Sequence, residues 1–301
     1  MNPGQCRSLP FVALMVFSLT GSRPCAAVEA PPGALLPAKF AQATADFAAG
    51  RFAECRVGFV SAGREALRAG LAARAYYGAA CCAAQMGDGD AAFEALALAV
   101  GNGFRDVERA LVDPRLDPMH TDPRWLGFLK AVEERRVSHR AAMNPTLLAL
   151  AAQQEKDRVE KSAPAAALER RAAERRAQAL EFVDKGRLQE PGDYFHAAAL
   201  LAESDVLEEV ARARALAWRA LELDPDLLSA RPVYAAALDR ERFLSAKPQL
   251  FGTQLRFRND RWELQEVEPT TTDADRAAWG LPTLAELQAL ATGLPAPRAA
   301  P

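Results

Sequence analysis

Two stretches, GRFAECRVGFVSA at positions 50–62 and GDGDAAFEALALA at positions 87–99, decide the fold of this chain. Each begins with a turn glycine and has a small residue five positions later, a large apolar residue four further on and an alanine three beyond that. Spacings of four and three place the last three residues on one face of a helix. The small members, Cys55 and Ala92, allow a neighbouring helix to approach closely. The two stretches therefore predict packed helices that begin after Gly50 and after Gly87.

A partner helix precedes each of these turns, over residues 40–49 and 72–86. This arrangement resembles the tetratricopeptide repeat, a unit of two antiparallel helices with a period of about 34 residues. The Asp-Pro steps at positions 113–114, 117–118 and 122–123 are similar to the closing segment of bacterial repeat proteins of this type. The resemblance implies a short helix near 106–112 and a closing helix near 123–136, and hence a tetratricopeptide-like domain over residues 37–136.

Composition favours helices and excludes some partners. Half of the residues are hydrophobic, alanine dominates them, and aromatic residues are only 7%. Small apolar residues suit closely packed helices better than β-sandwiches, which are rich in β-branched and aromatic residues. The formal net charge of −2 argues against nucleic acid or an anionic membrane surface as a partner.

The N-terminal residues are typical of a secretory signal. Arg7 supplies a positive charge, an apolar run extends from Leu9 to Leu19, and small residues lead to Ala27. We expect a signal peptide over 1–27, with cleavage after Ala27 or Ala30; the alternative is a buried N-terminal helix. Later stretches are too short and polar to span a bilayer. The mature chain is thus expected to be exported, periplasmic or extracellular, with no membrane span.

Export would also permit disulfides, because the periplasm and the cell exterior are oxidising. Three cysteines, Cys55, Cys81 and Cys82, lie beyond the predicted signal. The sequence leaves open whether Cys55 pairs with Cys81, with Cys82 or with neither.

A second helical domain is predicted over residues 144–290. Charged helices fill 144–190, with a break at Pro164, and their interleaved charges indicate a solvated face. Asp193 is expected to cap the next helix, and helices follow over 208–223 and 228–245. Alternation then predicts a β-hairpin over 251–267 that Trp262 anchors, with Arg256, Arg258, Glu263 and Gln265 in solvent. Thr272 and Thr283 begin capping boxes, and the tail 291–301 is expected to be disordered. The fold class is therefore mainly α, with one β-hairpin.

The most distinctive motif is PQLFGTQ at positions 248–254, with Asp239-Arg240 upstream and Trp279-Gly280-Leu281-Pro282 downstream. Together they resemble an uncharacterised bacterial domain family across residues 144–290, as does DYFHAA at 193–198. The sequence departs from that family at 202–204, where a Gln-His pair is expected. The family has no established activity. The polar cluster has a structural interpretation and a ligand-site interpretation, and its members are Asp239, Arg240, Gln249, Gly252, Thr253 and Gln254.

Two functions follow as hypotheses. His120, His139 and His196 have no metal-ligand spacing, and the chain has no nucleophile motif or phosphate-binding loop, so neither metal nor cofactor is predicted. The favoured function is a binding module for a protein or peptide, with a groove lined by Arg74, Tyr77 and Gln85. The alternative is an enzyme or small-ligand-binding protein with its site in the 239–254 cluster.

Overall fold

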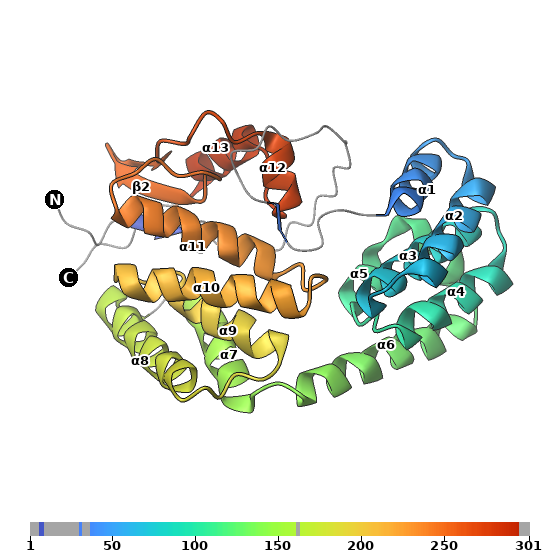
Figure 1. Cartoon of the computed structure of the whole chain (residues 1–301), viewed down its shortest axis with the longest axis horizontal. Helices are drawn as coiled ribbons and strands as arrows, with labels where there is room; N and C mark the ends of the chain where they lie inside the picture. The colour runs from blue at the N-terminus through green and yellow to red at the C-terminus, as the bar shows by residue number, and fades with distance from the viewer. Residues whose placement is uncertain (1–5, 9–29, 32–36, 161–162, 295–301) are drawn as a thin grey trace. The chain divides into compact units, whose positions relative to one another are not determined.

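The protein is mainly helical in the computed structural model, which describes residues 6–8, 30–31, 37–160 and 163–294 (Figure 1). The described residues form two compact units that meet in sequence between Ala142 and Met143. Most of the predicted signal peptide and residues 295–301 of the predicted tail lie outside the described residues. No described helix is long and apolar enough to cross a bilayer.

The N-terminal unit begins with four helices, α1 (Ala38–Ala48), α2 (Phe52–Glu65), α3 (Ala69–Gln85) and α4 (Gly89–Gly101). Three residues join each helix to the next, and such short connections make neighbouring helices antiparallel. Gly50 and Gly87 have φ values of 72° and 74° at the first and last connections, a conformation that glycine adopts without strain. The helices predicted around both turns are confirmed.

Helix α3 lies at the centre of this unit, and its residues from Leu71 to Ala84 are buried except for Arg74. Glycines allow α2 and α3 to approach closely, because a Cβ at Gly63 or Gly78 would lie 2.9 Å from an aromatic ring of the other helix. A disulfide between Cys55 and Cys82 also joins the two helices, while Cys81 is a buried thiol. The structure thus selects one of the pairings that the sequence leaves open.

The closing segment of the unit has a short helix α5 (Val107–Val112), a 3-10 helix (Pro114–Met119) and a long helix α6 (Arg124–Ala141). The short helix and the closing helix are confirmed. Helix α6 continues five residues beyond its predicted end, because no helix-breaking residue occurs before Asn144-Pro145. Trp125, Phe128 and Val132 are the buried residues of α6.

Five helices begin the second unit: α7 (Pro145–Val159), α8 (Ala165–Asp184), α9 (Pro191–Leu201), α10 (Leu207–Leu223) and α11 (Ala230–Leu244). Pro164 directly precedes α8, as predicted. Asp193 does cap α9, but from the third position of the helix: it forms a capping box with Glu190, the residue directly before the helix. Its carboxylate accepts hydrogen bonds from the backbone N–H groups of Gln189, Glu190 and Asn144, which connects the starts of α9 and α7.

The predicted hairpin is present as β2 (Gln254–Arg258) and β3 (Arg261–Leu264), and β1 (Cys6–Ser8) pairs antiparallel with the other edge of β2. Asn259 and Asp260 form the turn with positive φ values of 51° and 59°. The strands are shorter than predicted because residues 248–253 form a loop around Asp239. Helices α12 (Asp273–Ala278) and α13 (Leu284–Gly293) follow, both with the predicted capping boxes. The prediction that the disordered tail begins at residue 291 is wrong, because Ala291 is a buried residue of α13, which continues to Gly293.

Trp262 is buried against α13 beside Leu287 and Ala291, as its predicted anchoring role requires. Solvent exposure is confirmed for Arg258 and is only partial for Arg256, Glu263 and Gln265, which are half-buried. Arg256 lies 5.7 Å from the centre of the Phe243 ring, so its long side chain covers apolar surface.

An aromatic group that the sequence patterns did not indicate fills the centre of the second unit. Trp279 is 1% exposed, and its ring stacks on that of Tyr234 with centroids 4.4 Å apart. Phe251 contacts Trp279 edge-on at 5.8 Å, and Trp218 lies 6.3 Å away. These rings join α10, α11, the 248–253 loop and α12 in one core.

Candidate functional site

The 248–254 motif folds around a single buried carboxylate. Asp239 on α11 accepts hydrogen bonds from the backbone N–H groups of Leu250, Phe251 and Thr253 at 2.7, 3.0 and 3.0 Å. The Thr253 hydroxyl donates a fourth bond at 2.8 Å. Burial raises the pKa of Asp239 from its ordinary value, and these four donors oppose that shift. A carboxylate can accept all four bonds at once, so Asp239 fixes the path of the loop.

Glutamine side chains close the remainder of the loop. The amide of Gln249 donates to the carbonyl oxygens of Gln254 and Gln265, and its oxygen accepts from the backbone N–H of Gln254. The Gln254 amide donates to the carbonyl of Ala236 and to the Thr253 hydroxyl. Between them, Gly252 has a φ of 91°, a left-handed conformation that favours glycine. The Gln-x-x-x-x-Gln spacing of the motif is therefore used for backbone hydrogen bonding.

One arginine, Arg276, completes the network, and Arg240 has its partners elsewhere. Arg276 on α12 donates from Nε to the carbonyl of Phe251 at 2.9 Å, so Asp239 and Arg276 bind the N–H and the C=O of the same residue. Arg240 follows Asp239 on α11, and successive side chains of a helix point in different directions. The Arg240 side chain is therefore directed away from the Asp239 carboxylate. It donates to the carbonyl of Ser204 and pairs with Asp205, in the connection between α9 and α10.

Except for Arg240, the predicted polar cluster is thus brought together, and all six of its residues are buried. Its charged and amide side chains are 2% exposed or less, and most of its polar atoms are satisfied within the protein. The exceptions in the network and beside it are Nη2 of Arg276 and Nη1 of Arg240, which are buried without a hydrogen-bond partner in the described residues. A closed network of this kind supports the structural interpretation over the ligand-site interpretation.

The three residues predicted to line a groove on the first unit have different environments. Gln85 is exposed, and its amide donates to the carbonyl of Arg115 at 2.9 Å. Arg74 is half-buried, with its guanidinium 5.4 Å from the centre of the Phe40 ring. Tyr77 is 2% exposed, so its assignment to the groove is wrong. An aromatic ring beside apolar helices is stabilised more by burial than by exposure at a surface.

Tyr77 instead belongs to a cluster with Asp113 and Cys81, which are buried, and Arg115, which is half-buried. Its hydroxyl donates to the Asp113 carboxylate at 3.0 Å, and its ring stacks on Phe104 at 4.5 Å. Burial raises the pKa of the Tyr77 phenol and raises the pKa of the Cys81 thiol to about 12. Burial opposes ionisation of Asp113 as well, but hydrogen bonds from Arg115 hold the pKa of this carboxyl below its ordinary value. The cluster fastens the Asp-Pro segment to α3.

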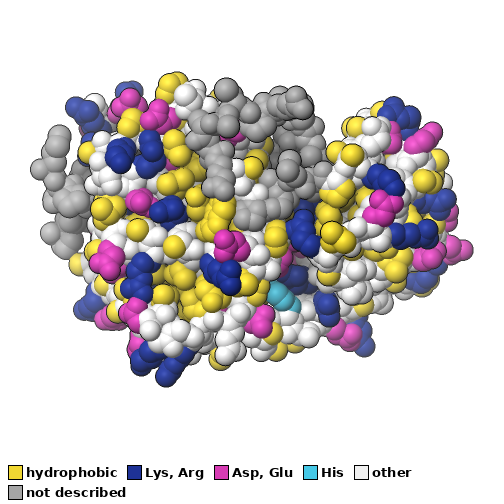
Figure 2. All heavy atoms as spheres, viewed as in Figure 1, with side chains coloured by type: hydrophobic (Ala, Val, Ile, Leu, Met, Phe, Trp, Pro, Cys, Tyr) yellow, Lys and Arg dark blue, Asp and Glu magenta, His cyan; other side chains and the backbone are white. Residues whose placement is uncertain are grey.

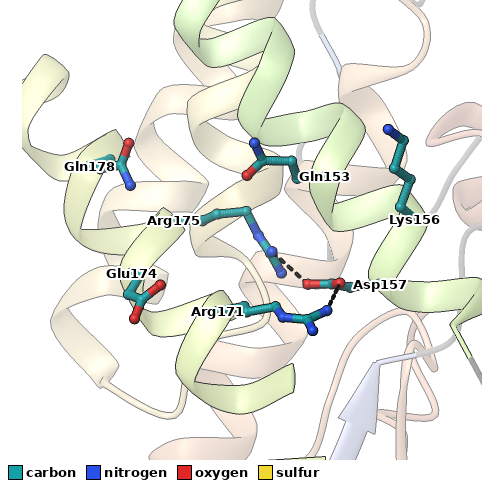
Figure 3. Close-up of a pocket in the computed structure, with 7 residues that line it drawn as sticks. All are labelled: Gln153, Lys156, Asp157, Arg171, Glu174, Arg175 and Gln178. Atoms are coloured by element: carbon teal, nitrogen blue, oxygen red, sulfur yellow. Dashed lines mark hydrogen bonds and ion pairs between the residues drawn. The ribbon is translucent and has the colours of Figure 1, made fainter. Parts of the chain in front are cut away.

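A hollow between α7 and α8 is a further candidate, which the sequence patterns did not indicate. It has a volume of about 230 Å³ and is lined by Gln153, Lys156, Asp157, Arg171, Glu174, Arg175 and Gln178. The α7 members follow spacings of three and four, as do the α8 members, so each set occupies one helix face. Figure 3 shows Arg171 and Arg175 directed from α8 towards Asp157 on α7. We call this the α7–α8 hollow.

Charge in the α7–α8 hollow is organised around Asp157. Arg175 donates to its carboxylate at 2.6 Å and Arg171 at 2.8 Å, and these bonds hold the pKa of Asp157 below its ordinary value. Arg175 is only 6% exposed. The Glu-Arg-Arg repeats of α8 predicted a solvated face, and this is wrong for Arg175. Arg171 and Arg175 are four residues apart and so share one helix face, a spacing that could have indicated a common partner.

Surface charge elsewhere follows the balanced composition. On the face drawn in Figure 2, Lys and Arg side chains are interspersed with Asp and Glu side chains. Across the described ranges, no group of three or more His, Cys, Asp and Glu side chains is arranged to hold a metal ion.

The comparisons with known proteins give no match: no protein-family model, no curated protein and no solved structure is similar to this chain.

Proposed function

We propose that the chain is an exported helical-repeat module that binds another protein or peptide, or scaffolds an assembly, in the cell envelope. The helical hairpins formed by α1 to α4 are the observation that carries this proposal. Stacked helix pairs expose the first helix of each pair on a common surface, which suits recognition of a second chain. The side chains of the Gly-Thr-Gln motif bond to one another, to Asp239 and to the backbone, so we place the binding site on the first unit instead.

Arg74 and Gln85 mark the proposed binding surface on α3, the first helix of the second pair. They are eleven residues apart, which is about three helical turns, so they lie on the same side of the helix. One contributes a cation and the other an exposed amide, and both groups can recognise the backbone or an acidic side chain of a partner. The Cys55–Cys82 disulfide supports the proposed location, because disulfides persist in oxidising compartments.

In-cell photo-crosslinking tests the binding surface. A photo-reactive residue at position 85 should give a crosslink to one envelope protein, and the additional change Arg74→Glu should abolish that crosslink. The matched control carries the photo-reactive residue in place of Glu94, which is exposed on α4, the second helix of the same pair. Equal crosslinks from both positions, or none from position 85, would show that this surface does not bind a partner.

Export is tested separately by fractionation and by mass spectrometry of the N-terminus. The mature protein should begin at Val28 or Pro31 and occur outside the cytoplasm. Recovery of an uncleaved chain from the cytoplasm would refute the proposed location and leave the binding surface to be judged on the crosslinks.

A further inference from the structure

The packing of α7 and α8 explains why a hollow exists between them. Both helices pack against α9 more extensively than against each other, and the chain between them turns at Pro164. Their facing side chains are long and polar, so they border the space without filling it as apolar side chains would. Figure 3 shows Gln153 on α7 and Gln178 on α8, with the Arg175 side chain extending from α8 past Gln153 towards Asp157.

Arg175 is the residue that points to a ligand. A guanidinium presents five N–H donors, and one that is buried normally has acceptors for them. Arg175 has its side chain 7% exposed and one carboxylate partner, Asp157. Its Nε is buried and has no hydrogen-bond acceptor among the residues that the structure describes. The α7–α8 hollow therefore contains a buried cation with unused donor capacity.

The balance of charge around the hollow favours an anion. Two lining arginines share the single carboxylate of Asp157. The other acidic residue, Glu174, is 63% exposed and has an ion-pair partner outside the hollow, Arg170, at 3.9 Å. Lys156 adds a third positive charge at the rim, and in Figure 3 its side chain extends away from Asp157. Positive charge thus exceeds the negative charge that can neutralise it inside the hollow.

We propose that the α7–α8 hollow binds a small carboxylate, with Arg175 and Arg171 as its cationic ligands and Gln153 and Gln178 as hydrogen-bond donors. A planar guanidinium matches a carboxylate through paired N–H donors. The volume of about 230 Å³ is below the roughly 300 Å³ at which drug-sized ligand sites begin, so the proposed ligand is smaller than a drug-sized molecule. Arg171 and Arg175 both donate to the Asp157 carboxylate. A ligand carboxylate would therefore compete with Asp157 for these arginines or share them with it.

Titration of the full chain with succinate, followed by NMR or calorimetry, tests this proposal. Saturable binding with a dissociation constant on the order of 1 mM is expected for so small a ligand. Neutral succinamide has nearly the same shape and should not bind. Phosphate that binds as tightly as succinate would overturn the assignment of a carboxylate, and the absence of saturable succinate binding would overturn the site.

Variants locate the site and separate binding from folding. Arg175→Gln and Arg171→Gln should each weaken succinate binding about 10-fold or more, the effect expected for one charge-assisted contact. Arg219→Gln is the control, because Arg219 is on α10 of the same unit, 52% exposed, and neither it nor its partner Glu222 lines the hollow; the affinity of this variant for succinate should be unchanged. Asp157→Asn should tighten binding, since it frees both arginines from their internal carboxylate. Unchanged affinity in Arg171→Gln, a variant of a 45% exposed side chain, would refute the proposal even if Arg175→Gln does not fold.

Discussion

Replacing Asp239 with alanine should strongly destabilise the second unit. The substitution removes the acceptor of three backbone N–H groups and one hydroxyl, all in a buried loop. A buried donor left without a partner costs about 1–3 kcal/mol. Four such donors give a loss of about 4–12 kcal/mol, with the low end applying if the loop opens and admits water. A domain is stabilised by only about 5–15 kcal/mol, so Asp239→Ala should leave this unit at the edge of unfolding.

Two milder variants keep the measurement interpretable. Asp239→Asn retains an acceptor oxygen and the side-chain shape, so it should be destabilised less than Asp239→Ala. Thr253→Val removes only the hydroxyl donor and should cost about 1 kcal/mol. Asp184→Ala is the control, because Asp184 is a surface residue, 60% exposed, that pairs with Arg212; exposed pairs contribute about 0–1 kcal/mol.

Denaturant unfolding of the full chain provides the assay. Three of the four tryptophans, Trp218, Trp262 and Trp279, lie in the second unit and Trp125 lies in the first, so fluorescence reports mainly on the second unit. Far-ultraviolet circular dichroism reports on both units. The free energy of unfolding should fall in the order control, Thr253→Val, Asp239→Asn, Asp239→Ala. If Asp239→Ala is no less stable than Asp184→Ala, the carboxylate does not organise the 248–254 loop and the structural interpretation of the motif fails.

Further predictions concern the cysteines and the hairpin. Reduction of the Cys55–Cys82 bond, which spans 27 residues, should lower the free energy of unfolding of the first unit by about 3.5 kcal/mol on the chain-entropy estimate; a melting curve that dithiothreitol leaves unchanged would contradict this. Burial raises the pKa of the Cys81 thiol from 9.0 to about 12. Iodoacetamide at about pH 8.5 should therefore label Cys81 only after unfolding, because the thiolate forms readily only in the unfolded chain. The native state holds the thiol proton more tightly than the unfolded state, so raising the pH above 9 should lower the free energy of unfolding. Trp262→Ala should cost about 3–5 kcal/mol, whereas Arg258→Ala, at an exposed position, should change stability by no more than about 0.5 kcal/mol; equal effects would show that the hairpin is not anchored through its tryptophan.

Local signals in the sequence were sufficient where a neighbour along the chain determines the conformation. The turn glycines at 50 and 87, the break at Pro164 and the capping boxes at Thr272 and Thr283 each act within a few residues, and the structure contains all of them. The mainly helical fold follows from such signals together with apolar periodicity.

Long-range partners could not be predicted in the same way. Arg74 and Tyr77 are three residues apart on α3, so helix periodicity gives them the same face. Tyr77 is buried because Phe104 and Asp113, from a later segment of the chain, pack against it. Aspartate is a favoured residue before a helix, but α9 begins at Pro191, which suits the first turn of a helix, and Asp193 therefore lies inside it. The shared partner of Arg171 and Arg175 depends on how α7 and α8 meet across Pro164, and sequence spacing on one helix does not reveal that.

The Asp239 network also bears on the order in which the chain can fold as it is made. Helices α1 to α4 pack mainly on their sequence neighbours, so the first unit can form progressively as each hairpin emerges. The 248–254 loop cannot be completed in this way, since the Phe251 carbonyl receives its donor from Arg276, 25 residues later. Until Arg276 has been made, the Phe251 carbonyl lacks the donor that it has in the folded unit. The second unit should therefore become compact only after Arg276 has emerged, and a chain cut before Arg276 should remain open to proteolysis.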